Sequence, residues 1–311
     1  PLGTRTAKAY CDDWRRAGYE IDVSPFMDSA LWAVVHKRGH YPSKIFGVLR
    51  GHLRRMRDML RVGRYDLVYV FMWVTPIGTS LFERLTRKLA RALVFDVEDS
   101  VLIGQNLPPD YNPNALTKLL KSTAKAEFLI ARADHVITSS PFLNDDCLGI
   151  NLRKACTYIT SSVDVDRYVV NNAYRNDHVV TIGWTGTFSS RVYLDLLRPV
   201  FERLAKLRKL RLIVIGNFEY AFDGVDLEVI QWTKENEIAD LQKFDIGVYP
   251  LPLDDWVLGK SGLKAIQYMA MALPCVATRV GMSERIIEND VNGLLARTED
   301  EWVEALTRLI D

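Results

Sequence analysis

Residues 256–278 read W-V-L-G-K-S-G-L-K-A-I-Q-Y-M-A-M-A-L-P-C-V-A-T and decide the fold. The segment 263–272 has helical spacing, and the short apolar run 275–278 is typical of a buried strand. A glycine-containing loop therefore leads into a helix and then a strand. This order is typical of an α/β domain with a parallel sheet.

The same loop has the features of an anion site. Gly259 and Gly262 allow backbone amides to approach a ligand, and the dipole at a helix start favours negative charge. Lys260 lies on the loop and Lys264 in the first helical turn, where a bound anion would offset its unfavourable placement. The alternative is that both lysines are solvated surface charges.

The rest of the second half continues the alternation of strands and helices. The strands are expected at 179–183, 210–216, 227–230 and 246–249, with helices at 193–207, 235–243 and 299–310. Thr298 is the expected N-cap of the last helix. A glycine-rich turn, G-W-T-G-T-F-S-S at 183–190, follows the first of these strands and precedes a helix, as in nucleotide-binding βα units.

The first half shows the same pattern. Strands are expected at 67–71, 92–95, 135–138 and 156–159, and helices at 5–17, 45–62, 81–92 and 115–131. No strand precedes the first helix, so we expect that the first strand is absent and that the numbered chain is trimmed at both ends. The polar stretch 171–177 marks the boundary between the predicted domains, 1–174 and 175–311.

Composition fits a globular protein of two domains, with 311 residues, 48% of them hydrophobic and 25% charged. No run reaches the roughly 18 apolar residues of a membrane span. Four separated cysteines and five histidines lack metal-ligand spacing, so we expect no metal or other cofactor.

Charge is divided unevenly. Residues 1–175 hold 25 Lys and Arg against 18 Asp and Glu, and residues 176–311 hold 15 against 21. The segment 49–61 is a basic amphipathic helix, with Leu49, Leu53, Met56 and Leu60 on one face. It is either a solvated face or a contact with an anionic membrane surface. Nucleic acid is not expected, because the helix lacks interleaved aromatic residues and the second half is acidic.

Residues 244–295 resemble the C-terminal domain of family 4 retaining glycosyltransferases, nearest to the bacterial polysaccharide and lipopolysaccharide type. The pattern W-x-x-G-K-x-G-x-K-x-x-Q-Y-M-A-x-x-x-P runs from Trp256 to Pro274. The resemblance implies the α/β GT-B fold, in which two Rossmann-like parallel-sheet domains face a central cleft. The first would bind an acceptor and the second a nucleotide-sugar donor. It also implies transfer to a hydroxyl of a glycan or lipid-linked glycan, with retention, in the cytoplasm or at the inner face of the plasma membrane.

The resemblance also assigns roles to residues. The catalytic candidates are Lys260, Lys264 and Asp99, the last from the sequence D-V-E-D that follows a strand. The donor-binding candidates are Gly186, Thr187, Trp232, Gly262, Gln267, Glu284, Gly3 and Arg5. For Trp232 the alternative is a buried core side chain, and for Glu284 and the acids near Asp99 it is an ordinary surface or capping carboxylate.

One departure from the family concerns catalysis. Many members have two glutamates eight residues apart, where this chain has Gly259 and Gln267. Gln267 can still accept hydrogen bonds from ribose hydroxyls, and Asp254 or Asp255 could replace the first carboxylate. Two other functions stay open: a degenerate GT-B protein that binds a nucleotide sugar or a partner without turnover, and a nucleotide-sugar epimerase.

Overall fold

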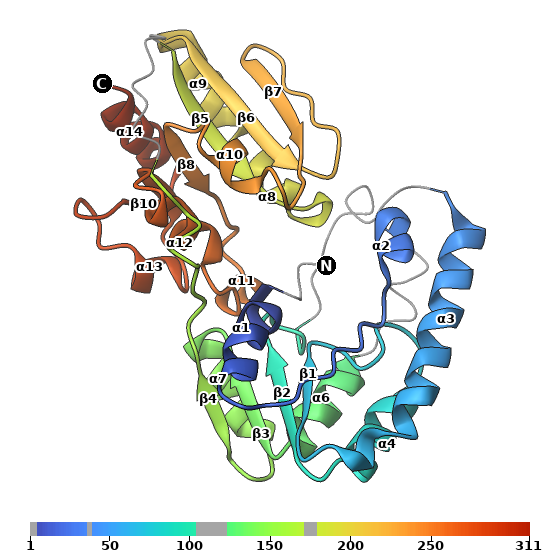
Figure 1. Cartoon of the computed structure of the whole chain (residues 1–311). Helices are drawn as coiled ribbons and strands as arrows, with labels where there is room; N and C mark the ends of the chain where they lie inside the picture. The colour runs from blue at the N-terminus through green and yellow to red at the C-terminus, as the bar shows by residue number, and fades with distance from the viewer. Residues whose placement is uncertain (1–4, 36–38, 104–122, 171–178) are drawn as a thin grey trace. The chain divides into compact units, whose positions relative to one another are not determined.

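The computed structural model describes residues 5–35, 39–103, 123–170 and 179–311. The chain forms two compact units, Pro1–Thr160 (unit 1) and Ser161–Asp311 (unit 2). This division falls before the predicted boundary at 174 and 175, which lies outside the described residues. Figure 1 shows that each unit has a sheet with helices packed on it.

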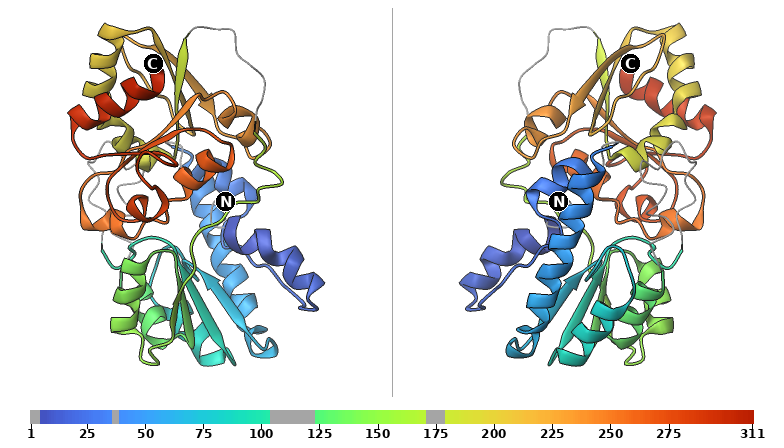
Figure 2. Two further views of the ribbon diagram at one scale, coloured as in Figure 1. Left: turned by 90° about the vertical axis from the view of Figure 1, so that its left-hand side faces the viewer. Right: turned by 90° about the vertical axis from the view of Figure 1, so that its right-hand side faces the viewer.

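Unit 1 contains a parallel sheet with the strand order β1-β2-β3-β4. Its strands are β1 (Val68–Phe71), β2 (Leu93–Val97), β3 (His135–Thr138) and β4 (Cys156–Tyr158). Its helices are α1 (Arg5–Arg16), α2 (Ser29–Val35), α3 (Tyr41–Met59), α4 (Leu81–Leu89), α6 (Thr123–Arg132) and α7 (Pro141–Ile150), with a short 3-10 turn at Val62–Arg64. In Figure 2 the strands lie between α6 and α7 on one side and α3 on the other.

All four predicted strands of unit 1 are present, but α2 and α7 were not predicted. The start of α7 has a clear local signal, because the Ser140 hydroxyl accepts a hydrogen bond from the Leu143 amide at 3.2 Å and Pro141 occupies the first turn. The helix expected at 115–131 is seen as α6, and residues 104–122 lie outside the described part.

A buried ionic cluster joins three segments of unit 1. Lys125 Nζ donates to the Thr75 carbonyl at 3.0 Å and lies 3.8 Å from Glu83 Oε1, which accepts from the Thr75 hydroxyl at 2.9 Å. Both charged side chains are almost fully buried, and Glu83 Oε2 has no hydrogen-bond partner among the described residues. The cluster fixes the segment after β1 to α4 and α6.

Unit 2 contains a six-stranded parallel sheet with the order β10-β9-β8-β5-β6-β7. Its strands are β5 (Val180–Thr185), β6 (Leu210–Gly216), β7 (Asp226–Gln231), β8 (Ile246–Tyr249), β9 (Cys275–Thr278) and β10 (Leu294–Ala296). Its helices are α8 (Arg191–Asp195), α9 (Arg198–Leu207), α10 (Glu237–Leu241), α11 (Asp255–Leu258), α12 (Leu263–Ala270), α13 (Ser283–Ile286) and α14 (Glu299–Ile310).

The prediction of one helix over 193–207 is wrong. The structure has α8 and α9, and a proline lies in the first turn of α9. Pro199 has no amide hydrogen to continue the helix from α8, but it is well placed in a first turn. Strand β10 and the short helices α11 and α13 were not predicted, whereas Thr298 caps α14 as expected, with its hydroxyl accepting from the Glu301 amide at 3.3 Å.

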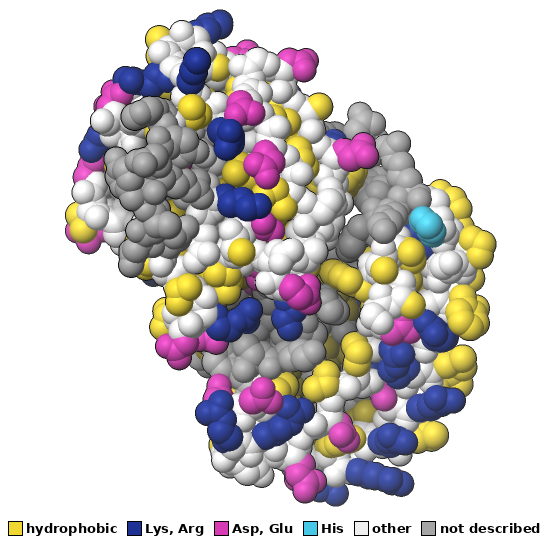
Figure 3. All heavy atoms as spheres, turned by 45° about the horizontal axis from the view of Figure 1, so that its top comes forward, with side chains coloured by type: hydrophobic (Ala, Val, Ile, Leu, Met, Phe, Trp, Pro, Cys, Tyr) yellow, Lys and Arg dark blue, Asp and Glu magenta, His cyan; other side chains and the backbone are white. Residues whose placement is uncertain are grey.

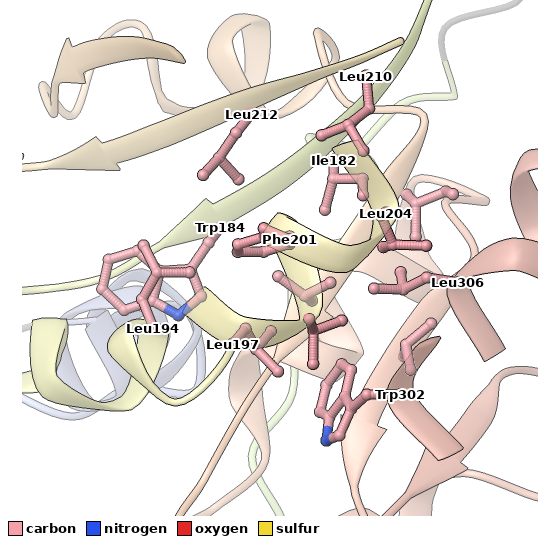
Figure 4. Packing of buried hydrophobic residues seen from close by; sticks show 14 of the residues in the cluster. Ile182, Trp184, Leu194, Leu197, Phe201, Leu204, Leu210, Leu212, Trp302 and Leu306 are labelled. Carbon is pink, nitrogen blue, oxygen red and sulfur yellow. The ribbon is translucent and has the colours of Figure 1, made fainter. Parts of the chain in front are cut away.

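Two hydrophobic clusters cover the sheet of unit 2. One contains Trp184 from β5, Phe201 from α9 and Trp302 from α14, as Figure 4 shows. The other contains Tyr268 from α12, together with Phe244 and Tyr249. A sheet buried by both clusters explains why β5, β6 and β8 read as nearly continuous apolar runs.

We predict that Lys125→Met will destabilise unit 1 strongly. The substitution leaves the Glu83 carboxylate buried and unpaired, which costs about 3–5 kcal/mol. Arg91→Met is the matched control because it removes an exposed ion pair with Asp66, and it should cost less than about 1 kcal/mol. Urea denaturation of both variants measures the difference, and equal losses would contradict the structural role of the buried pair.

Candidate functional site

The candidate site begins at the N-terminus of α12. Gly262 precedes this helix with φ 73°, and a Cβ at this position would lie 2.3 Å from Ile286 Cδ1. Only glycine combines this backbone conformation with the close approach of α13. No side chain caps the helix, so the amides of its first turn are available to a ligand.

Lys264, in this first turn, is surrounded by aromatic rings. Its Nζ lies 4.6 Å from the centroid of the Trp184 ring and 5.7 Å from that of Tyr249. Burial, and secondly the charge of Lys260, lower the pKa of Lys264 to about 7. No carboxylate within the described part of the chain forms an ion pair with this amine. A partly buried cation next to a second cation is unfavourable, and an anion bound beside both would offset that cost.

Lys260 lies on the loop between α11 and α12. Its Nζ is 5.5 Å from the centroid of the Trp256 ring, and its amide donates to the Val257 carbonyl at 3.0 Å. The preceding helix α11 is capped by Asp254, whose Oδ1 accepts from the Val257 amide at 3.1 Å. Asp254 therefore has a structural role at the start of α11, whereas Asp255 does not cap this helix.

The Trp184 ring contacts both the glycine-rich turn and Lys264. A Cβ on Gly186 would lie 2.1 Å from Trp184 Cη2, so only glycine lets the turn pass over the indole ring. The Gly186 amide donates to the Ile215 carbonyl at 2.9 Å, and the Thr187 amide donates to Ser190 Oγ at 2.9 Å. Both amides are used within the protein, and the exposed Thr187 hydroxyl lies 3.2 Å from the hydroxyls of Ser189 and Ser190.

Glu284 and Trp232 lie beside these loops. Glu284 is exposed on α13, and the neighbouring Gly281 is close enough to α11 that its Cβ would be 3.5 Å from Leu258 Cα. The Trp232 amide donates to the Gly216 carbonyl at 3.2 Å, and a Cβ on Gly216 would lie 2.8 Å from the Gly186 carbonyl oxygen. The Trp232 ring is partly buried against the cluster that contains Tyr268.

Gln267 points into unit 2. It is only 3% exposed, and its Nε2 donates to the Tyr168 hydroxyl at 2.7 Å and to Glu237 Oε1 at 3.4 Å. Its role toward a ribose stays a prediction. Neither Tyr168 nor Glu237 was predicted from the sequence, because both are distant along the chain from the loop and belong to no motif.

The candidates in the first half belong to unit 1. Asp99 is partly buried after β2, whereas Asp96 is buried and accepts a hydrogen bond from the Tyr69 hydroxyl. Burial raises the pKa of Asp96, and the hydrogen bond from Tyr69 opposes the shift. Gly3 lies outside the described residues, and Arg5 is described only as the first backbone position of α1.

The described residues contain no group of three or more His, Cys, Asp or Glu side chains that could hold a metal ion. No described helix is long and apolar enough to cross a membrane. The expectation that no metal or cofactor takes part stays a prediction.

Comparison with known proteins gives the class of this fold. Residues 179–311 match the family model described as "Glycosyl transferases group 1", whereas no curated protein matches the chain. The structure is similar to sucrose-phosphate synthase from Thermosynechococcus elongatus, with TM-score 0.60 and 14% identity over 86% of this chain and 70% of that one. A glycosyltransferase from Rickettsia africae gives TM-score 0.58 and 13% identity over 94% and 74%. HepE from Anabaena, in complex with UDP and glucose, gives 0.55 and 15% over 83% and 70%.

The fold is therefore GT-B, with two α/β units built on parallel sheets, as predicted. The family model covers residues 179–311, so unit 2 is similar to the group 1 glycosyl transferases, while the structural similarities show the fold of the chain.

We predict that anion binding at Lys264 depends on pH. The amine is charged below its pKa of about 7 and loses its proton, and its attraction for anions, as pH rises through that value. The affinity for pyrophosphate should therefore fall by up to about tenfold between about pH 6 and about pH 8.5, relative to Lys264→Arg, which stays charged. Titration calorimetry measures the affinity of both proteins for pyrophosphate. The comparison between the two proteins corrects for the ionisation of pyrophosphate itself. Parallel pH profiles would contradict the assignment.

Proposed function

We propose that this protein is a glycosyltransferase that moves a sugar from a nucleotide sugar to a hydroxyl of a glycan or lipid-linked glycan. The observation that carries the proposal is the pair of lysines at the start of α12. Lys264 is held against Trp184 beside Lys260, with no carboxylate of the described residues paired to it. The diphosphate of a nucleotide sugar supplies the missing negative charge.

The reaction breaks the bond between the anomeric carbon and the diphosphate oxygen and forms a bond to the acceptor oxygen. Negative charge develops on the leaving diphosphate, where Lys260, Lys264 and the first-turn amides of α12 stabilise it. The acceptor hydroxyl loses its proton, and the leaving phosphate accepts it in the retaining mechanism that the sequence resemblance implies. Asp99 is the proposed carboxylate on the acceptor side. In this proposal no metal ion is required.

The donor would contact several elements of unit 2. The Thr187 hydroxyl is exposed at the glycine-rich turn, and Trp232 is placed next to that turn through Gly216. We propose that Trp232 stacks on the nucleobase and that Glu284 contacts the sugar or ribose. The similar HepE structure is a complex with UDP and glucose, so UDP is the first nucleotide to test. Transfer would take place in the cytoplasm or at the inner face of the plasma membrane.

A second candidate function is nucleotide-sugar binding without turnover. It is favoured by Gly259, which provides no carboxylate, and by Gln267, whose amide is already bonded to Tyr168 and Glu237. Both observations concern catalysis and sugar contacts, whereas the two lysines concern the diphosphate. Binding and turnover must therefore be measured separately.

We predict that Lys260→Ala will lower the rate of transfer by about 100- to 1,000-fold, the usual cost of removing one charge-stabilising group. The thermal unfolding temperature should stay the same, because Lys260 is partly exposed on a loop. Transfer is measured with a panel of nucleotide sugars carrying UDP, GDP, dTDP or CDP. The nucleotide is chosen as the one whose diphosphate raises the unfolding temperature most.

Lys206→Ala is the matched control, since Lys206 is an exposed lysine on α9 and takes no part in the site. Near-normal transfer by Lys260→Ala would refute the assigned role of Lys260. Binding of a nucleoside diphosphate without transfer or hydrolysis of any donor would instead favour the second candidate function.

A further inference from the structure

Helix α3 exposes its apolar face to solvent. Seven large apolar side chains along it are between 57% and 82% exposed: Tyr41, Ile45, Phe46, Leu49, Leu53, Met56 and Leu60. Apart from the neighbours Ile45 and Phe46, they follow one another at intervals of three or four residues, so they form one stripe, which we call the α3 stripe. Figure 3 shows hydrophobic side chains along the right-hand edge of the molecule, where α3 lies, with Lys and Arg side chains beside them.

The opposite face of α3 packs on the rest of unit 1. Gly47 and Gly51 are buried there, so close to Leu31 and Phe26 that an added Cβ would lie 2.9 Å and 2.7 Å from them. Arg55 is also buried, and its Nε donates to the Val74 carbonyl at 2.9 Å. These contacts fix the rotation of the helix, so the α3 stripe cannot turn inward without breaking them.

Basic side chains border the α3 stripe. Arg50, Arg57 and Arg61 are exposed, and Arg50 also pairs with Asp28 at 2.5 Å and approaches the ring of Phe46 at 5.2 Å. The helix has a single carboxylate, Asp58, and this group is bonded to Arg55 and to the Ser24 hydroxyl. The surface is therefore apolar along its centre and positively charged along its border.

We infer that the α3 stripe is a membrane-docking surface that lies in the interface of an anionic lipid bilayer. An amphipathic helix of this kind buries its apolar face at the boundary of headgroups and acyl chains, while its arginines contact anionic headgroups. At 19 residues the helix is about 28 Å long, enough for a flat, continuous contact. The net charge of +7 over residues 1–175 adds a long-range attraction to the same surface.

A second copy of the chain fits this surface less well. Two α3 stripes packed on each other would bring like-charged arginines together, and the only carboxylate of each helix is already engaged by Arg55. An anionic bilayer supplies both the apolar layer and the counter-charge. This docking goes beyond the proposed transfer reaction and does not depend on it.

The experiment is co-sedimentation of the full chain with vesicles of phosphatidylglycerol and phosphatidylcholine, compared with phosphatidylcholine alone. The intact chain should bind the anionic vesicles preferentially. The triple variant Leu49→Gln, Leu53→Gln, Met56→Gln should bind them at least about tenfold more weakly, because three apolar side chains no longer enter the bilayer. The pair Arg57→Gln, Arg61→Gln should lose about fivefold for each arginine at low salt.

Matched controls carry the same changes elsewhere on the surface. Leu152, Leu207 and Val291 are 65%, 68% and 71% exposed, and their replacement by Gln should leave vesicle binding unchanged. Arg132→Gln with Arg285→Gln is the control for charge. Unfolding temperatures verify that every variant is folded.

Three results would overturn the inference. The first is equal recovery on anionic and neutral vesicles, and the second is vesicle binding by the apolar triple variant that equals that of the intact chain. The third is a dimer, seen by light scattering, that becomes a monomer in the triple variant, because the α3 stripe would then be an interface between copies.

Discussion

The packing of Tyr268 on Gly247 determines the position of the candidate site. A Cβ on Gly247 would lie 2.5 Å from the Tyr268 ring, so the absence of a side chain on β8 lets α12 approach the sheet closely. The Tyr268 hydroxyl accepts from the Thr185 amide at 3.3 Å, which joins α12 to the end of β5 as well. Because α12 is only eight residues long, this contact also fixes its first turn and the lysine that lies there.

The position of α12 also determines the electrostatic environment of Lys264. Lys264 lies one turn before Tyr268, so its amine faces the Trp184 ring and the residue is partly buried. A partly desolvated cation without a carboxylate partner destabilises a fold, and a second lysine nearby increases the cost. Such a cost is typical of sites where a ligand completes the charge balance. The lowered pKa of Lys264 and the proposed affinity for a diphosphate therefore have the same origin.

Unit 1 places its own charges differently. Lys125 and Glu83 are buried as a pair, and Arg55 has backbone and side-chain acceptors, so these charges hold loops together and need no ligand. The arginines that border the α3 stripe are exposed instead. The buried charges therefore stabilise unit 1, whereas the exposed border arginines, of which Arg50 is also paired with Asp28, are accessible to a partner.

The sequence by itself determined the order of strands and helices and the lysine loop before α12. These features depend on local periodicity and on neighbouring residues, and the strands of both sheets were predicted with the exception of β10. The break between α8 and α9 was also local, since Pro199 marks it, and the prediction of one helix overlooked it.

Only the tertiary structure decided what each face contacts. Periodicity placed Leu49, Leu53 and Met56 on one face of a helix but could not show that this face is exposed, because that depends on Gly47, Gly51 and Arg55 packing on the opposite side. The contact of Lys264 with Trp184 and the burial of Gln267 against Tyr168 join residues far apart in the chain. No local pattern contains such contacts, since they arise only when the sheet brings distant strand ends together.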